Sequence, residues 1–241
     1  PTAAVSAGMN LRALVASTAG TLLIATAVTL AAAPEPDPQA AVDLPEFTQS
    51  APGAWINSPP LTRAALEATV KGAFIEVTIE DSDVFAYLSR QLVKRDDFPG
   101  QVAVWRSEDA VNLVLRDGVL VATRGLPNDL LAASTLVRAG GPKGPSGSGL
   151  RRYEVAALDN ASVSFTLACE VTDLGPERIE IVELSYPTRH LRESCAGSGP
   201  QAGSRVVNDY WISPRTGHIW QSRQWAGEQI GYLRIRQLTT E

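Results

Sequence analysis

Apolar and polar residues alternate with a period of two over most of the chain after residue 72, and this pattern constrains the fold more than any other feature. Successive side chains of a β-strand point to opposite faces of a sheet, so strict alternation predicts strands with one buried face. The chain is therefore predicted to fold mainly into strands. The alternating segments are residues 73–81, 101–126, 149–158, 163–175, 178–186, 204–213, 218–227 and 232–238.

Turn residues separate these segments at regular intervals. Asp117 and Gly118 lie between NLVLR and VLVAT, and they favour the two positive φ angles that a two-residue type I′ hairpin turn requires. Residues 215–217 and the pair Asp159 and Asn160 are further turn candidates. Repeated hairpins at a spacing of about 10 residues predict an antiparallel meander that curls into a barrel or half-barrel.

Two short helices are also predicted. Thr62 is a plausible N-cap for the helix formers that follow it, and Gly72 would end that helix. The second helix would begin near Asp129 and end at the glycines of residues 140–141. The predicted fold class is thus a mainly β, antiparallel meander forming a barrel or half-barrel with one or two short helices.

An uncharged apolar run occupies residues 13–33, after Met9 and Arg12 and before Pro34. A basic start, an apolar middle and small residues at the exit are typical of a secretory signal, so residues 1–33 are interpreted as an N-terminal extension with a signal or anchor segment. If the run is retained, it is long enough to cross a bilayer and would hold the chain at a membrane surface. A cytosolic chain is the third interpretation that the sequence leaves open.

Proline recurs through residues 34–61, which are predicted to form an extended tether. Residues 62–241 then form a single β-barrel-like domain, because this length suits one domain with one core.

The two cysteines of the chain are Cys169 and Cys195. Because export permits disulfides, we predict that the two are paired, and two buried free thiols are the alternative. Together with His190 and His218 the cysteines do not have the spacing of a zinc site, and no metal or other cofactor is predicted.

The charge of the chain argues against one class of partner. A formal net charge of −5 and an isoelectric point near 5.2 provide no attraction to a polyphosphate backbone. Nucleic acid is therefore not an expected partner.

Three of the five tryptophans lie in one stretch, NDYWISPRTGHIWQSRQW, which spans residues 208–225. The stretch is predicted to form a hairpin, and cross-strand aromatic pairs would stabilise it by roughly 0.2–1 kcal/mol each. On the second strand, alternation places Trp220 with Ser222 and Gln224 on one face. The residues predicted to have a structural role in the hairpin are Tyr210, Trp211, Gly217 and Trp220.

Arg223 and Trp225 share the other face of that strand in the predicted alternation. A guanidinium beside an indole can stack on a sugar ring and form a paired hydrogen bond with a carboxylate, so these two are candidates for contact with an acidic polysaccharide or a protein partner. The alternative is an ion pair within the protein, for example between Arg223 and Asp209.

No catalytic motif is evident. Neither histidine has a hydrolase setting, and a nucleophile elbow, a glycine-rich phosphate loop and a zinc-protease helix are absent from the sequence. The chain is therefore not expected to be an enzyme, and no catalytic residue is assigned.

The order of these motifs resembles the YjbF/GfcB family of envelope lipoproteins over roughly residues 70–240, most specifically in the stretch that ends in SRQW. The resemblance implies a compact antiparallel barrel-like domain in the periplasm or at the periplasmic face of the outer membrane. It also implies an accessory role in exopolysaccharide or capsule production, with proteins of the export machinery as partners. Family members carry a lipobox cysteine, whereas LAAAPEPDP at residues 30–38 has none.

A periplasmic lipid or lipoprotein carrier with a LolA-like half-barrel is the alternative function. Alternating strands and an apolar helix that closes a concavity would suit such a carrier equally well. This alternative depends on analogy of fold alone.

Overall fold

The computed structural model describes residues 61–134, 144–157 and 161–240, all of which belong to one compact unit. The described elements are one α-helix, one short 3₁₀ helix and twelve strands. The helices are α1 (Arg63–Thr69) and η2 (Gly199–Gln201). The strands are β1 (Phe74–Ile79), β2 (Val84–Lys94), β3 (Val102–Arg106), β4 (Asn112–Arg116), β5 (Val119–Arg124), β6 (Leu130–Ala133), β7 (Ser148–Ala156), β8 (Ser162–Ile181), β9 (Leu184–Ala196), β10 (Arg205–Ile212), β11 (Ile219–Trp225) and β12 (Tyr232–Thr239).

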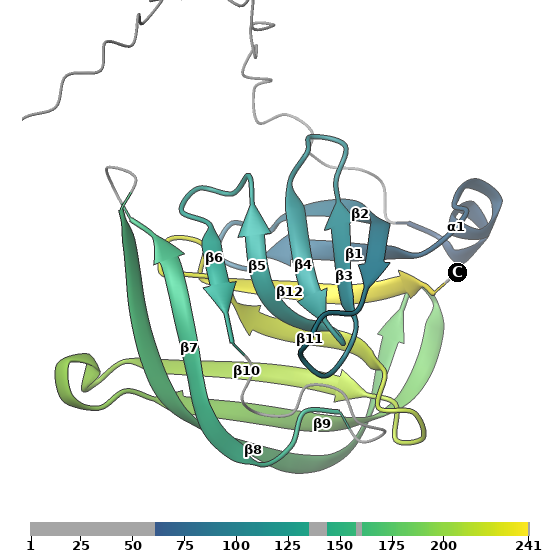
Figure 1. The fold of residues 1–241 in the computed structure, drawn as a ribbon. Helices are drawn as coiled ribbons and strands as arrows, with labels where there is room; N and C mark the ends of the chain where they lie inside the picture. The colour runs from purple at the N-terminus through teal and green to yellow at the C-terminus, as the bar shows by residue number, and fades with distance from the viewer. Residues whose placement is uncertain (1–60, 135–143, 158–160, 241) are drawn as a thin grey trace, which may run out of the picture. The chain divides into compact units, whose positions relative to one another are not determined.

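All twelve strands form one antiparallel sheet in the order β5-β4-β3-β2-β1-β12-β11-β10-β9-β8-β7-β6. Strands that follow each other in the chain are paired, except β5 and β6, which are the two edges of the sheet. In addition, β1 pairs with β12, from Phe74 opposite Thr239 to Ile79 opposite Leu233. The sheet curls until its two outer strands, β5 and β6, lie beside each other (Figure 1). This arrangement confirms the predicted antiparallel meander and its barrel-like closure.

Apolar side chains from most strands fill the inside of the curled sheet. Leu88, Leu113, Leu120, Leu167 and Leu233 are each no more than 1% exposed. They come from β2, β4, β5, β8 and β12, so the core is shared around the sheet and its burial favours closure.

The turns agree with the sequence where the structure describes them. Asp117 and Gly118 join β4 to β5 with φ angles of 46° and 85°, and Gly217 has a φ of 73° in the turn between β10 and β11. Strands β7 and β8 form the expected hairpin, from Ser148 opposite Glu170. The turn residues predicted there, 159–160, lie outside the described residues.

The first predicted helix is confirmed as α1. The side chain of Thr62 accepts a hydrogen bond from Ala65 N at 3.2 Å, and Val70 ends the helix two residues before Gly72. Leu66 is buried beside Ile181 in a cluster between α1 and the tip of the β8–β9 hairpin.

The second predicted helix is wrong. Leu130–Ala133 form β6 instead, and the Asp129 carboxylate accepts hydrogen bonds from Gly125 N and Leu126 N in a tight turn. Leu130 is completely buried in the core, so tertiary packing overrides a local preference for helix. The rest of that segment, residues 135–143, lies outside the described residues.

No helix within the described ranges is long and apolar enough to span a membrane. The predicted signal or anchor segment, residues 1–33, and the predicted tether, residues 34–61, lie outside the described residues except for Leu61. The predicted division of the chain therefore stays a prediction.

Candidate functional site

The C-terminal hairpin of β10 and β11 contains the predicted site residues. Asp209 lies opposite Arg223 and Tyr210 opposite Ser222, which places Tyr210 inside the barrel and Arg223 outside. A β-bulge between Trp211 and Ile212 shifts the register, because Trp211 lies opposite Gln221 while Ile212 lies opposite Ile219.

The bulge moves Trp220 away from the face that alternation predicted. Trp220 packs with Trp211 in the cluster that contains Leu66 of α1, rather than with the buried Ser222 and Gln224. The ring of Tyr186 lies 4.3 Å from that of Trp220, and His190 stacks on Trp211 at 4.5 Å, both measured between ring centroids. The two tryptophans thus pack beneath side chains of β9, while the structural role predicted for them stays a prediction.

The ladder between β10 and β11 stops at Asp209, although β10 begins at Arg205. Beyond this point side chains replace the backbone pairing. Val207 N donates to Tyr232 Oη at 3.1 Å, Arg223 Nη1 donates to Val207 O at 3.4 Å, and Trp225 N donates to Asn208 Oδ1 at 2.8 Å. The barrel wall is therefore split between the start of β10 and the end of β11.

Arg223 is held at this split by three groups. Besides its bond to Val207 O, its Nε lies 2.6 Å from Glu80 Oε2, and its guanidinium lies 3.5 Å from the centroid of the Tyr232 ring. The ion-pair partner is thus Glu80 and not Asp209, which instead contacts His190 Nε2 and Arg192 Nε.

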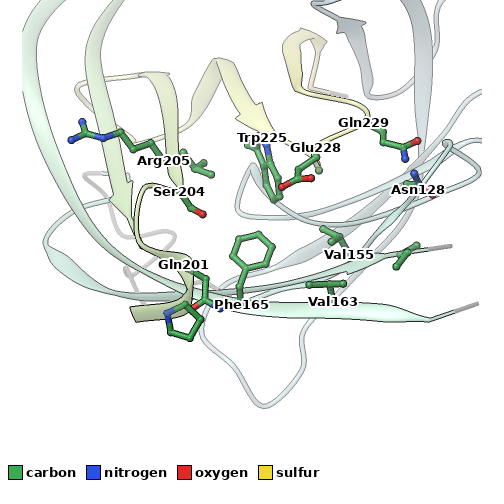
Figure 2. A pocket seen from close by; sticks show the side chains of 15 residues that line it. Asn128, Val155, Val163, Phe165, Gln201, Ser204, Arg205, Trp225, Glu228 and Gln229 are labelled. Carbon is green, nitrogen blue, oxygen red and sulfur yellow. The ribbon is translucent and has the colours of Figure 1, made fainter. Parts of the chain in front are cut away.

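Trp225 points into the mouth of the barrel, where its ring meets Tyr153 and Phe165 edge to face at centroid distances of 5.1 and 5.7 Å. It lines a cavity of about 500 Å³ at this end of the sheet (Figure 2). The apolar floor consists mainly of Val155, Ala156, Val163, Phe165, Val206 and Trp225. Polar side chains form the rim, namely Asn128, Gln201, Ser204, Arg205, Glu228 and Gln229.

Arg223 is not among the residues that line this cavity. The predicted common face of Arg223 and Trp225 is therefore not found, because the ladder between β10 and β11 ends at Arg223 and Trp225 turns inward beyond it. The arginine at the cavity is Arg205, which the sequence analysis did not single out.

A buried ion pair lies deeper inside the barrel and was also missed. Arg151 Nη1 of β7 contacts Glu193 Oε2 of β9, and the same oxygen accepts from Asn208 Nδ2 at 2.7 Å and Tyr210 Oη at 3.0 Å. Arg151 Nη2 donates to Leu120 O at 3.1 Å. Alternation was the available signal, because it places Glu193 on the same buried face as Cys195.

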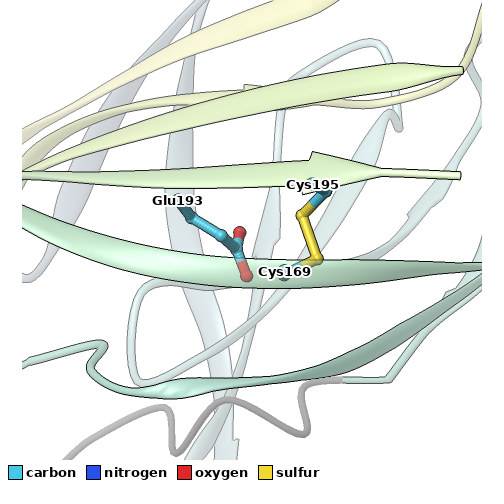
Figure 3. Close-up of side chains that lie close together, drawn as sticks. All are labelled: Cys169, Glu193 and Cys195. Atoms are coloured by element: carbon cyan, nitrogen blue, oxygen red, sulfur yellow. A yellow bond between two sulfur atoms is a disulfide. The ribbon is translucent and has the colours of Figure 1, made fainter. Parts of the chain in front are cut away.

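The predicted disulfide is confirmed. Cys169 of β8 and Cys195 of β9 lie directly opposite each other, with Cα atoms 4.0 Å apart, and their sulfur atoms are bonded. Figure 3 shows the Glu193 carboxylate beside this bond. The three residues lie close enough to suggest a metal site, but the bonded sulfur atoms are not available as thiolate ligands.

Side chains also form hydrogen bonds with backbone groups along the seam, the line where the edge strands β5 and β6 lie beside each other. Gln224 Oε1 of β11 accepts from Leu120 N at 2.8 Å, and Gln224 Nε2 donates to Gly118 O at 2.9 Å. Thr123 Oγ1 accepts from Leu130 N at 2.9 Å where β5 meets β6. Each contact satisfies a backbone group that an open edge would leave unpaired.

Replacing Gln224 with leucine should lower the free energy of unfolding by about 1–3 kcal/mol, because Leu120 N would stay buried without an acceptor. Denaturant unfolding measures the change. Gln221→Leu is the matched control, since Gln221 lies on the outer side of the same strand, and it should change stability by less than about 0.5 kcal/mol. Equal losses in the two variants would contradict a role of Gln224 at the seam.

Two tyrosines, Tyr153 and Tyr210, are buried inside the barrel. Burial raises the pKa of Tyr153 to about 12 and that of Tyr210 well above its usual value, so both phenols stay protonated at neutral pH. Arg205 and Glu228 are the charged side chains of the rim. The arrangement suits binding of a ligand with one apolar face and several hydrogen-bonding groups.

The fold is an up-and-down, barrel-shaped domain, and the cavity described above lies at one mouth of the barrel. The chain belongs to the YjbF family, described as group 4 capsule polysaccharide lipoprotein gfcB, whose family model matches residues 57–238. The resemblance stated from the sequence is thereby confirmed, and membership of a lipoprotein family indicates an exported protein.

A solved structure shares the fold. The hypothetical lipoprotein YmcC from Escherichia coli (K12) matches with a TM-score of 0.58 and 18% sequence identity, over 77% of this chain and 99% of that chain. A search of curated proteins finds no significant match.

Proposed function

We propose that the protein is a non-enzymatic accessory factor for the production and export of extracellular polysaccharide, an exopolysaccharide or a capsule. The observation that carries the proposal is the family match, which covers nearly all of the described domain. The protein would act in the periplasm or at the periplasmic face of the outer membrane. The disulfide between Cys169 and Cys195 supports an oxidising compartment.

Proteins of the polysaccharide export machinery are the proposed partners, with acidic polysaccharide as a further ligand. The apolar residues 13–33 would hold the chain at the membrane surface. This arrangement would keep the barrel near the site at which polysaccharide leaves the cell.

The barrel interior supports this function over that of an acyl-chain carrier. The centre of the barrel holds the Arg151–Glu193 ion pair, whose charges would be costly beside a hydrocarbon chain. Closely packed leucines and aromatic rings occupy the remaining interior. The cavity at the mouth also has a polar rim, which an acyl chain would not use.

Deleting the gene should abolish or strongly reduce extracellular polysaccharide, and complementation with residues 9–241 should restore it. Polysaccharide released into the medium is the measured quantity. Unchanged polysaccharide in the deletion strain would contradict the proposed function.

Arg223 and Trp225 are proposed to support contact with the polysaccharide or a partner, Trp225 in the cavity and Arg223 at the split in the wall. Replacing Arg223 with alanine and Trp225 with phenylalanine, which keeps an aromatic ring in the core, should reduce polysaccharide output in the complemented strain while the protein remains folded. Arg90→Ala on β2 is a suitable control, because Arg90 lines a different cavity. If the melting temperature and the polysaccharide output both fall sharply, the two residues have a structural role, and the proposed contact with polysaccharide or a partner is contradicted.

A further inference from the structure

The rim of the mouth cavity carries polar side chains that the protein itself does not use. Within the described residues, the side chains of Asn128, Gln201, Ser204, Arg205, Glu228 and Gln229 form no hydrogen bond or ion pair with one another or with the rest of the protein. Three of them are carboxamides and a fourth is a hydroxyl, and such groups both donate and accept hydrogen bonds. These groups are free to bind a ligand.

The rim side chains come from different parts of the chain. Asn128 belongs to the β5–β6 loop, Gln201 and Ser204 to the β9–β10 connection, and Glu228 and Gln229 to the β11–β12 loop. Figure 2 shows them around the opening, with Trp225 and Phe165 between them. A ligand in the cavity would thus be contacted from several sides.

The floor has the opposite chemistry. Phe165 is partly buried against the core, and Val163 is 52% exposed at the cavity although it is a large apolar residue. Trp225 itself is only 8% exposed, so its indole supports Phe165 more than it offers a free face. The ligand would therefore meet a small apolar surface of Phe165, Val155 and Val163 inside a ring of hydrogen-bonding groups.

We infer that the mouth cavity binds a short sugar segment, with the apolar face of one ring on Phe165 and Val163 and its hydroxyl groups on the rim carboxamides. A pyranose combines an apolar C–H face with hydroxyls that donate and accept, which matches this floor and this rim. The volume of about 500 Å³ lies in the range of about 300–1,000 Å³ that ligand pockets occupy. Arg205 would meet a carboxylate if the sugar is acidic.

This inference rests on the proposed function for the source of the sugar, since the ligand would be a segment of the exported polysaccharide. The probe is a set of oligosaccharides released by mild acid hydrolysis from the extracellular polysaccharide of the host. Calorimetric titration of the full chain with these oligosaccharides should give saturable binding.

The double variant Gln201→Ala and Gln229→Ala should weaken binding by about tenfold, because two hydrogen bonds to the sugar are lost. Both side chains lie at the rim, so the melting temperature should not change. Gln91→Ala removes an exposed carboxamide from β2, outside the cavity, and should bind like the wild type.

Absence of binding to the wild-type chain, or equal affinity of the rim variant and the wild type, would overturn the inference. Displacement of the oligosaccharides by a fatty acid would also overturn it, because the apolar floor, and not the polar rim, would then determine which ligand binds. The deletion strain separates the two proposals. Lost polysaccharide without oligosaccharide binding would refute only the sugar site, whereas binding with unchanged polysaccharide would refute only the export role.

Discussion

Replacing Glu193 with glutamine is expected to lower the free energy of unfolding by about 3–5 kcal/mol. The substitution keeps the shape of the side chain but removes the charge that faces Arg151, which is 1% exposed and has no route to water. A buried cation without its anion pays a desolvation penalty that hydrogen bonds to neutral groups offset only in part. Urea or guanidinium unfolding at pH 7 measures the loss.

Two further variants separate the effect of the unpaired charge on stability from the effect of altered packing. Adding Arg151→Met to Glu193→Gln removes the unpaired cation, so the double variant should be more stable than Glu193→Gln alone. Asp173→Asn breaks the exposed pair between Asp173 and Arg189 and should cost less than about 1 kcal/mol. A double variant as unstable as the sum of its parts would mean that the charge itself is not the cause.

Removing the disulfide with Cys169→Ala and Cys195→Ala should cost about 2–4 kcal/mol. The bond closes a loop with a sequence separation of 26, and the chain-entropy treatment of such a loop gives about 3.5 kcal/mol. Both cysteines are buried in the core, so lost packing adds to the lost cross-link. Denaturant unfolding without reductant measures the total.

Reduction provides the control. Dithiothreitol should destabilise the wild type by most of this amount and leave the alanine variant unchanged. The remaining difference between the reduced wild type and the variant reports the packing of the two sulfur atoms. A wild type whose midpoint does not change on complete reduction would show that the cross-link adds no stability.

Local pattern was sufficient for most of the sheet. Alternation predicted the strands because each has one face in the core, and Asp117 with Gly118 predicted a hairpin because a tight turn needs their backbone angles. Local pattern failed after Asp129, because the sequence LLAA favours a helix in isolation. The core nevertheless needed Leu130 as part of a strand, which no local signal revealed.

The site was harder to predict because its contacts join distant parts of the chain. Arg223 binds Glu80, which is 143 residues away in sequence, and Trp225 meets rings from β7 and β8. Alternation predicted the wrong environment for Trp225, because it assumes that the ladder between β10 and β11 continues to the end of β11. The ladder with β10 stops at Arg223, although β11 stays paired with β12 as far as Trp225, and Trp225 turns towards the mouth of the barrel.

The pairing of β1 with β12 fixes the order in which the sheet can be completed. Strands β1 to β5 can form their meander as they emerge, but the outer edge of β1 has no partner until β12 has been translocated. Such an unpaired edge can recruit strands of other chains, and long-range pairing of this kind slows folding. The period of greatest risk for aggregation therefore comes before β12 is available to pair, and chaperones that cover strand edges should matter most for this protein then.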